Sequence, residues 1–333
     1  MFQGAVVTMV EFLVRRIVQS IGLLAVMSVL VFLAVFAVGN PVDILIAPEA
    51  TQADRARAIA SLGLDRPLLD QYLTFVSGIF EGDLGQSFVF KISALELILQ
   101  RLPATLELAV SAMLLSMLIG LPLGIVAGLK PDSWIGRAIM AGSIIGFSLP
   151  TFWVGLILIM VFAVHLGWLP STGRGETASL FGIEWSFLTR DGLAHLALPA
   201  LNLALFKISL VIRLVRAGMR ETLPLDYIRY AHAKGLRRAR VVLVHALKNV
   251  LIPLVTVLGL EFGSVIAFAI VTETIFAWPG TGKLIIDSIS VLDRPVLVAY
   301  LLVIVLMFVV INLAVDILYS VLDPRVRLAG ARA

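Results

Sequence analysis

The sequence predicts an all-α integral membrane protein with six transmembrane helices. Of its 333 residues, 60% are hydrophobic and only 14% are charged, whereas soluble domains are about 45–50% apolar and about 25% charged. Six apolar stretches are long enough to cross the hydrocarbon core of a bilayer, which takes about 20 residues. This composition excludes a soluble enzyme, a disordered chain and a nucleic-acid-binding protein, so the lipid bilayer is the expected surrounding.

The predicted spans, in chain order, cover residues 17–38, 106–129, 139–164, 194–215, 251–272 and 296–318. The fourth is the least apolar, because it contains Asn202 and Lys207. The first is too long for the apolar region of a signal peptide, and no small-residue cleavage site follows it. We expect Met9 to be the natural start, which would place Arg15 and Arg16 directly before the first span.

The basic residues predict that both termini are cytoplasmic, because lysine and arginine are enriched in cytoplasmic loops. Of the 26, 16 fall in the segments assigned to the inside or at their ends, and 9 fall outside. The cytoplasmic segments are then the lead 1–16, the loop 216–250 and the tail 319–333. The external segments are 39–105, 165–193 and 273–295. Within 39–105 we predict a small subdomain with helices over 53–62 and 67–75, the first ended by Gly63.

Two features of the spans concern helix packing. Gly120, Gly124 and Gly128 lie four residues apart on one face, a spacing that lets two helix backbones approach closely. They predict a packing seam within the chain or with a partner. Pro122 and Pro150 lie inside spans, where a proline bends a helix and frees a carbonyl; each is either a hinge or a static kink.

Two ionisable residues, Lys207 and Glu261, fall near the middle of their spans. A charge at that depth costs about 2.5–3.5 kcal/mol when it faces lipid. Both are therefore expected to face the protein interior or a hydrated path. They either pair with each other or meet a charged group of a transported solute.

No catalytic, metal-binding or nucleotide-binding motif is found. The chain has no cysteine, and it lacks the H-E-x-x-H and G-x-S-x-G patterns. Residues 278–283 resemble a phosphate-binding loop, but that motif requires glycine at Ala277 and serine or threonine at Leu284. The sequence thus predicts no catalysis and no cofactor bound by this chain.

The loop between the fourth and fifth spans predicts a short, rigid helix. Asp226 is placed as its N-cap, and Gly235 as its left-handed stop. A second helical stretch from about Arg238 runs directly into the fifth span. The short helix presents Tyr227, Tyr230, Ala231 and Leu236. By periodicity alone it either lies on anionic lipid or docks a soluble partner.

The same segment resembles a known family. Residues 226–236, followed by His245–Asn249 and Pro253, are similar to the coupling motif of permease subunits of bacterial ABC importers, in the dipeptide/oligopeptide/nickel branch. The general importer signature, Glu-Ala-Ala followed by three residues and glycine, would fall on residues 229–231, where only Ala231 matches. In that family the helix sits in a groove of the cytoplasmic ATPase. The resemblance therefore implies that the ATPase-coupling residues are Asp226, Tyr227, Arg229, Tyr230, Ala231, Ala233, Lys234, Gly235 and Leu236.

The resemblance covers nearly the whole chain. It includes residues 82–87, 101–108, 148–153, 167–170, 273–280 and 322–325. It implies the type I ABC importer permease fold, and the first of two paired permeases, the one with the long external segment. Glu261 departs from the glutamine expected there and Lys207 is equally unexpected, so these two residues are candidates for the translocation path.

The family implies a heterodimer with a second six-span permease, two cytoplasmic ABC ATPases that bind ATP and Mg, and a periplasmic solute-binding protein. It implies location in the bacterial inner membrane. The expected cargo is di- and oligopeptides; nickel chelates or glutathione are alternatives. A secondary transporter is a distant alternative, because no inverted repeat is found. A charge introduced at Ala231 is expected to uncouple ATP hydrolysis from transport without disturbing the fold.

Overall fold

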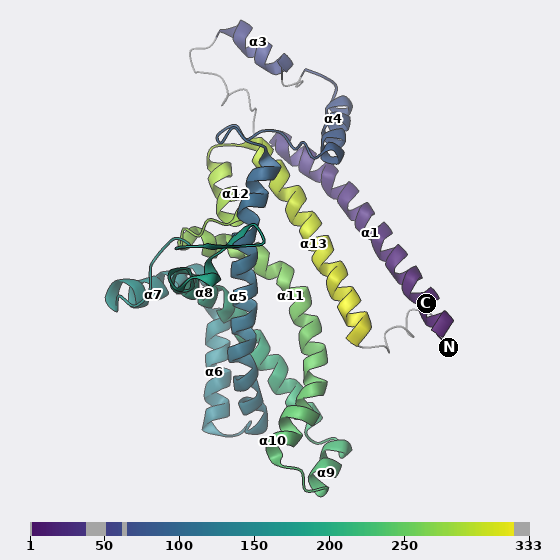
Figure 1. Cartoon of the computed structure of the whole chain (residues 1–333), viewed down its shortest axis with the longest axis vertical. Coiled ribbons are helices and arrows are strands. Elements are labelled where there is room, and N and C mark those ends of the chain that lie inside the picture. The colour runs from purple at the N-terminus through teal and green to yellow at the C-terminus, as the bar shows by residue number, and fades with distance from the viewer. Residues whose placement is uncertain (1, 38–50, 62–64, 323–333) are drawn as a thin grey trace. The chain divides into compact units, whose positions relative to one another are not determined.

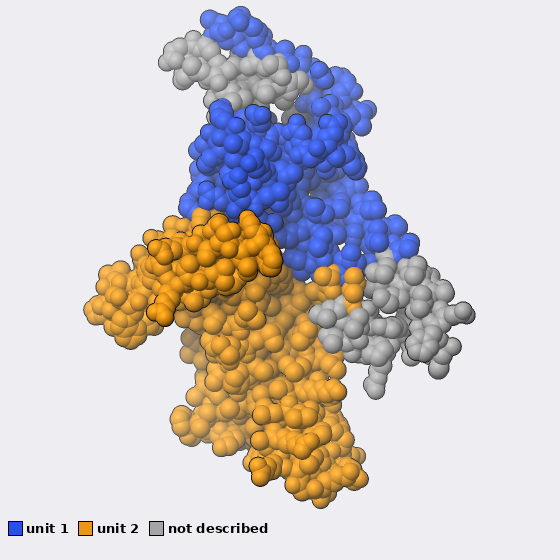
Figure 2. Space-filling model, in the orientation of Figure 1, with its two compact units in different colours: residues 1–102, 280–313 blue, residues 103–279, 314–333 orange. Residues whose placement is uncertain are grey.

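The computed structural model describes residues 2–37, 51–61 and 65–322. These residues are mostly helical, with one short hairpin (Figure 1). Gly63 and the parts of the predicted external segment and cytoplasmic tail at 39–50 and 323–333 lie outside the described residues. Contacts divide the chain into two compact units, residues 1–102 with 280–313 and residues 103–279 with 314–333 (Figure 2).

The first unit consists of helices that flank the predicted external segment. They are α1 (Phe2–Ala37), α3 (Gln52–Ser61), α4 (Leu68–Glu81), the start of α5 (Ala94–Leu129), α12 (Thr281–Ser290) and most of α13 (Arg294–Leu322). The helices predicted over 53–62 and 67–75 correspond to α3 and α4. The second of them extends further than predicted, to Glu81, where Gly82 ends it in the left-handed conformation.

Aromatic contacts join α4 to the apolar α1. The Tyr72 hydroxyl lies 2.9 Å from Ser28 Oγ. The ring centroids of Phe32 and Tyr72 are 5.3 Å apart, and those of Phe32 and Phe75 are 5.8 Å apart. Because Tyr72 and Phe75 lie on one face of α4, the amphipathic helix is held against α1 by that face.

The fully buried carboxylate of Asp293 organises the chain between α4 and α5. It accepts hydrogen bonds from the Ser87 hydroxyl and from the backbone N–H groups of Phe88 (3.1 Å) and Val89 (3.3 Å). Asp293 lies just before α13, so a buried acid links residues distant in sequence within this unit. A buried carboxylate that is supplied with several donors is stable only while those donors stay in place.

The second unit carries the remaining elements. They are the rest of α5, α6 (Trp134–Ser148), α7 (Thr151–Leu158), the π-helical η1 (Ile159–His165), strands β1 (Ala178–Leu180) and β2 (Ile183–Trp185), the 3-10 turn η2 (Ser186–Leu188), α8 (Arg190–Thr222), α9 (Asp226–Ala233), α10 (Arg238–Arg240), the π-helical η3 (Val241–Ala246) and α11 (Leu247–Ile275). The two strands pair antiparallel, with Ala178 opposite Trp185.

The third predicted span, 139–164, is not one continuous helix, and its break falls at Pro150, where a bend was predicted. It is divided between α6 and the α7–η1 helix, which are bent by 106° relative to each other. Leu149 has the extended conformation (φ −80°, ψ 135°) because Pro150 sterically disfavours a helical residue before it. Of the described helices, α1, α5, α8, α10–α11 and α13 are each long and apolar enough to cross a membrane, and the bent pair would form a sixth span.

The least apolar predicted span is the most buried of the candidate spans. In α8, 67% of the apolar window is buried within the protein, against 11–33% in the others. It contacts α6, α7 and α11. Its polar residues Asn202 and Lys207 are 1% and 3% exposed. A helix surrounded by protein can carry polar groups that find partners there, which explains its weaker hydropathy.

The three spaced glycines of α5 pack against α8 of the same chain. A Cβ atom on Gly120 would lie 2.8 Å from Val211 Cβ, one on Gly124 2.7 Å from Val215 Cβ, and one on Gly128 2.7 Å from Met219 Cβ. The partners on α8 are also spaced four residues apart. The seam is therefore internal to the chain, and the absence of side chains on α5 lets both backbones approach closely.

A buried acid on α5 fixes the hairpin, which the sequence did not predict. The Glu107 side chain is fully buried. Its carboxylate accepts hydrogen bonds from Arg174 Nη2 (2.7 Å) and from the N–H groups of Ser186 and Phe187 (2.8 Å each). Residues on both sides of the hairpin are thereby held against the start of the second predicted span.

The glycine seam predicts that Gly124→Ala lowers the stability of the protein. The new methyl group would meet Val215 Cβ and the Ile212 carbonyl oxygen, 3.0 Å away, both on a packed helix. We expect a loss of about 1–3 kcal/mol, typical of overpacking, seen as a lower melting temperature in detergent. Gly142→Ala on α6 is the control, because nothing lies within 4 Å of a Cβ there. Equal melting temperatures for the two variants would contradict the seam.

Candidate functional site

The short helix α9 is where the sequence predicted it, with one correction at its start. It begins at Asp226, and the residue in the N-cap position is Leu225, which offers no side-chain cap. The Asp226 carboxylate is exposed and lies 3.5 Å from Arg229 Nη1. As the first helical residue, Asp226 still complements the positive end of the helix dipole.

The C-terminal end of α9 has the predicted geometry. Gly235 adopts the left-handed conformation with φ +75°, which glycine accepts without steric cost. Its N–H donates to the His232 carbonyl at 2.9 Å, and the Leu236 N–H donates to the Ala231 carbonyl at 3.3 Å. The chain is turned sharply here, so that α10 and α11 follow at once.

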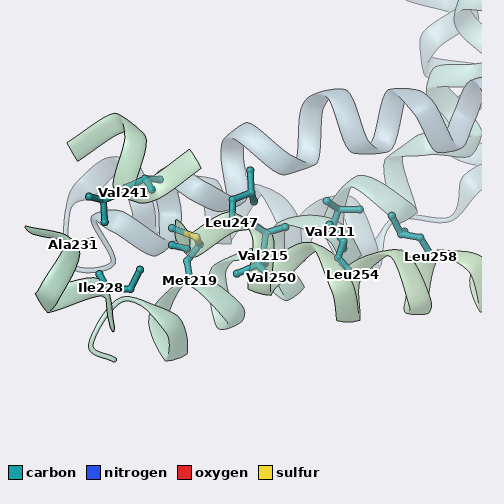
Figure 3. Close-up of a cluster of buried hydrophobic side chains, with 12 residues drawn as sticks. Val211, Val215, Met219, Ile228, Ala231, Val241, Leu247, Val250, Leu254 and Leu258 are labelled. Carbon is teal, nitrogen blue, oxygen red and sulfur yellow. The ribbon is translucent and has the colours of Figure 1, made fainter. Parts of the chain in front are cut away.

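The inner face of α9 packs into an apolar cluster. Ile228 and Ala231 are 1% and 7% exposed, and they lie beside Met219 of α8 and Val241 of η3 (Figure 3). The expectation for Ala231 is thereby corrected. A glutamate there would place a carboxylate in the cluster and disturb the fold, because a buried unpaired charge is costly.

The outer face of α9 is open. Tyr230 is 63% exposed, and the Lys234 ammonium lies 4.6 Å from the centroid of its ring. The other predicted coupling residues on this side are also exposed, except for Leu236, which is partly buried; they are Asp226, Tyr227, Arg229, Ala233, Lys234 and Gly235. The helix therefore presents an aromatic and basic surface, supported from behind by apolar packing.

Residues 238–275 form one continuous helix from α10 to α11. Its first part contains η3, where the Leu247 N–H donates to the Val242 carbonyl five residues back. This is a wider turn than that of an α-helix. The hydroxyl of Tyr227 on α9 bridges to this helix: it accepts a hydrogen bond from Asn249 Nδ2 (2.6 Å) and donates to the His245 carbonyl (3.4 Å).

Lys207 and Glu261 pair with each other between α8 and α11. Lys207 Nζ donates to Glu261 Oε2 and to Ser264 Oγ at 2.7 Å. The side chain of Lys207 is 4% exposed, whereas that of Glu261 is 35% exposed. The lysine is enclosed by the protein, and the glutamate reaches an open face.

Aromatic rings continue from this pair along α8 and α6. The Lys207 ammonium lies 5.2 Å from the centroid of Phe206, which stacks on Phe147 with centroids 4.4 Å apart. Arg213 lies over the other ring at 4.5 Å. Two cations within the predicted fourth span are thus stabilised by aromatic faces as well as by polar partners.

The residues that resembled a phosphate loop have structural roles. Trp278 is fully buried and donates from Nε1 to the Ala104 carbonyl at 2.9 Å. Lys283 pairs with Asp287 at 2.7 Å. Within the described ranges, no group of three or more histidine, cysteine, aspartate or glutamate residues could hold a metal ion.

Three contacts were missed by sequence reasoning: the bridge from Tyr227 to Asn249, the stack of Phe147 on Phe206, and the donors around Glu107. Each joins residues between 22 and 80 positions apart. A periodicity signal extends over a few turns and carries no information on such pairs. For Glu107 the sequence did offer a signal: an acidic residue stands at the start of the second predicted span, where a charged group needs a partner.

Comparisons with known proteins identify the family. A family model described as "Binding-protein-dependent transport system inner membrane component" matches residues 120–328. A second, described as the N-terminal part of a binding-protein-dependent transport system membrane component, matches residues 9–109.

Curated relatives match over nearly the full chain. The Di/tripeptide transport system permease protein DppB of Pseudomonas aeruginosa is 40% identical, over 96% of this chain and 99% of that protein. The Oligopeptide transport system permease protein AppB of Bacillus subtilis is also 40% identical, over the same shares. The Glutathione transport system permease protein GsiC of Escherichia coli O6:H1 is 37% identical, again over 96% and 99%.

A solved structure shares the fold. A chain of the inward-facing MetNI methionine ABC transporter superposes with a TM-score of 0.52 at 18% identity, covering 68% of this chain and 96% of that chain. The predicted fold class, an all-α permease of the type I ABC importer class, is confirmed. The chain is a multi-pass membrane protein that belongs to the family of inner-membrane components of binding-protein-dependent transport systems.

Proposed function

We propose that this chain is a permease subunit of an ATP-driven importer of di- and oligopeptides, forming half of the translocation path. The observation that carries the proposal is the 40% identity, over nearly the full length of both chains, to permeases named for di/tripeptides and oligopeptides. This chain carries no nucleotide-binding motif of its own, so the ATPase would be a separate protein. The exposed outer face of α9 supports this assignment, because it leaves a surface open for such a partner.

The proposed partners are a second permease, two cytoplasmic ABC ATPases and a periplasmic solute-binding protein. ATP and Mg would be bound by the ATPases, and no cofactor by this chain. With both termini in the cytoplasm, α9 lies on the ATPase side of the membrane, while the segment 39–105 lies on the binding-protein side. The excess of basic residues at the predicted inner segments supports this orientation.

In the proposed mechanism α9 docks its outer face, centred on Tyr230, into the ATPase. Closure of the ATPases on ATP would move α9 and favour an outward-open arrangement of the spans, and hydrolysis would reset it. Such coupling needs an element whose position differs between two states. The apolar packing behind α9 supports this role, because it places the helix directly against α8 and η3 with its outer face exposed.

The partly exposed Glu261 supports a path along α11. Within a span, lipid offers no hydrogen-bond donor to a carboxylate, so a 35% exposed glutamate should face water, cargo or a protein partner. Lys207 and Ser264 occupy Oε2. We therefore assign the pair to the wall of the path: Glu261 would interact with charged groups of the cargo, and Lys207 would hold it there as its enclosed counter-ion.

A different cargo is the second candidate. The glutathione permease of Escherichia coli is 37% identical over the same share of the chain, so glutathione fits the resemblance nearly as well. Nickel chelates are the other alternative within this architecture. All three would use the same coupling helix and differ in the binding protein that delivers the cargo.

The proposed function predicts which proteins are captured with this chain from its native membrane in mild detergent. We expect a second permease, ABC ATPases and a solute-binding protein, whose ligand can then be screened among peptides, glutathione and metal chelates. Capture of the chain alone, together with solute movement in vesicles without ATP, would instead support a secondary transporter.

The docking role predicts that Tyr230→Asp abolishes most ATP-driven uptake without unfolding the protein. The side chain is 63% exposed and lies outside the buried cluster, so the melting temperature should stay unchanged. A carboxylate left buried without a partner costs about 3–5 kcal/mol, so we expect docking to weaken and uptake in proteoliposomes to fall by at least about tenfold. Phe181→Asp at the tip of the hairpin is the matched control, since Phe181 is 95% exposed on the predicted external side. Equal uptake by both variants would rule out docking through Tyr230.

The charge pair predicts opposite effects of single and double substitution. Lys207→Met leaves Glu261 without its cation, and we expect a loss of about 3 kcal/mol, the lower end for a broken buried pair because the glutamate is partly exposed. Adding Glu261→Gln should restore the melting temperature. If the pair faces cargo, the restored double variant will show a raised KM for charged peptides. A wild-type KM in the double variant would show that the pair has only a structural role.

A further inference from the structure

The hydroxyl of Tyr227 makes the hydrogen bonds that join α9 to the helix leading into the membrane. It lies 2.6 Å from Asn249 Nδ2 and 3.4 Å from the His245 carbonyl oxygen. Among the described residues, these two hydrogen bonds connect a side chain of α9 with η3 and α11. Both are directional, since each weakens steeply as its geometry departs from linear.

The rest of the contact between α9 and this helix is apolar. Ile228 and Ala231 of α9 belong to the same buried cluster as Val241, Val242 and Ala246 of η3, and Figure 3 shows Ala231 beside Val241. Apolar packing is non-directional, and packed helices slide past one another by small shear movements. On their own, these contacts would let α9 shift without forcing α11 to follow.

Asn249 lies in a short helical segment whose backbone hydrogen bonding departs from that of a regular α-helix on each side. The π-helical turn η3 ends at Ala246, just before it. Pro253 follows within α11, and because proline has no N–H, the Asn249 carbonyl lacks its usual donor four residues on. Residues 247–252 are thus bounded by a wide turn and a missing helical hydrogen bond. The Tyr227 hydroxyl is bonded to this segment.

We propose that Tyr227 and Asn249 form the joint through which movement of α9 reaches the membrane-spanning part of α11. The inference rests on the proposed ATPase coupling of α9. When the docked helix moves, segment 247–252 is displaced with it through these hydrogen bonds. The helix bends at η3 on one side and at Pro253 on the other. Glu261 lies 12 residues beyond Asn249 on α11, about 18 Å along the helix axis, so the joint connects the docking helix with the charge pair. Tyr227 and Asn249 are positioning residues.

The test is the number of ATP molecules hydrolysed per peptide imported by the full complex in proteoliposomes, with its ATPases and binding protein. Tyr227→Phe keeps the ring and removes both hydrogen bonds. We expect this ratio to rise by about fivefold, the change in an equilibrium constant that corresponds to one net hydrogen bond, while the complex still assembles and melts at the same temperature.

Asn249→Ala removes the other half of the joint from a different helix. It should raise the ratio as well, and the double variant should be no worse than Tyr227→Phe alone, because Tyr227→Phe already removes the bond to Asn249 together with the one to the His245 carbonyl. Thr256→Val is the matched control: it deletes a hydroxyl on α11 whose 3.1 Å bond to the Ile252 carbonyl stays within that helix. Its ratio should equal that of the wild type.

The outcomes separate the joint from the function on which it rests. Additive effects of the two substitutions, or an effect of Tyr227→Phe alone, would overturn the joint and assign the tyrosine to the docking surface. Unchanged ratios in both variants, with normal ATP-driven uptake by the wild type, would also overturn it. Absence of ATP-driven uptake by the wild type would overturn the importer function itself.

Discussion

Close packing of α5 on α8 is the constraint on which the rest of the second unit depends. Three glycines one turn apart on α5 meet Val211, Val215 and Met219 on α8 at distances that leave no space for a methyl group. Lipid tails are as apolar as the side chains, so association of spans in a membrane depends on such close approach and on polar contacts. Because α8 also contacts α6, α7 and α11, its position determines where the other helices lie.

Polar groups within the spans supply the second kind of contact. Lys207 bonds to Glu261 and Ser264, and Asn202 bonds to Thr272 at 3.0 Å. Both sets join α8 to α11 within the fourth and fifth predicted spans, where a polar group without a partner is costly. Glu261 differs from the other polar groups of these sets in its exposure: about one third of its side chain faces outward, which suggests a hydrated or partner-covered face.

The short helix α9 is an extension of the same packing. The cluster that begins at Val211 and Val215, beside the glycine seam, continues through Met219 to the inner face of α9 (Figure 3). The exposed outer face of α9 is therefore supported from behind by the packed interior of the second unit. The hydrogen bonds of the Tyr227 hydroxyl to Asn249 and to the His245 carbonyl add a directional connection to this apolar support.

The sequence by itself determined the membrane class, the apolar stretches, the short helix within one residue of its start, and its left-handed end at Gly235. These depend on composition, helical periodicity and single-residue backbone preferences, which act over a few residues. Tertiary structure decided that Ala231 faces inward, that the glycines face α8, and that Tyr227 reaches Asn249. Tyr227, Ile228, Tyr230 and Ala231 share one broad apolar and aromatic face of this eight-residue helix, and only the neighbouring helices select Ile228 and Ala231 as the part of that face that is buried. The sharp bend at Leu149 lies between these cases: Pro150 made a bend predictable from sequence, but its 106° angle depends on how α6 and α7 pack against α8.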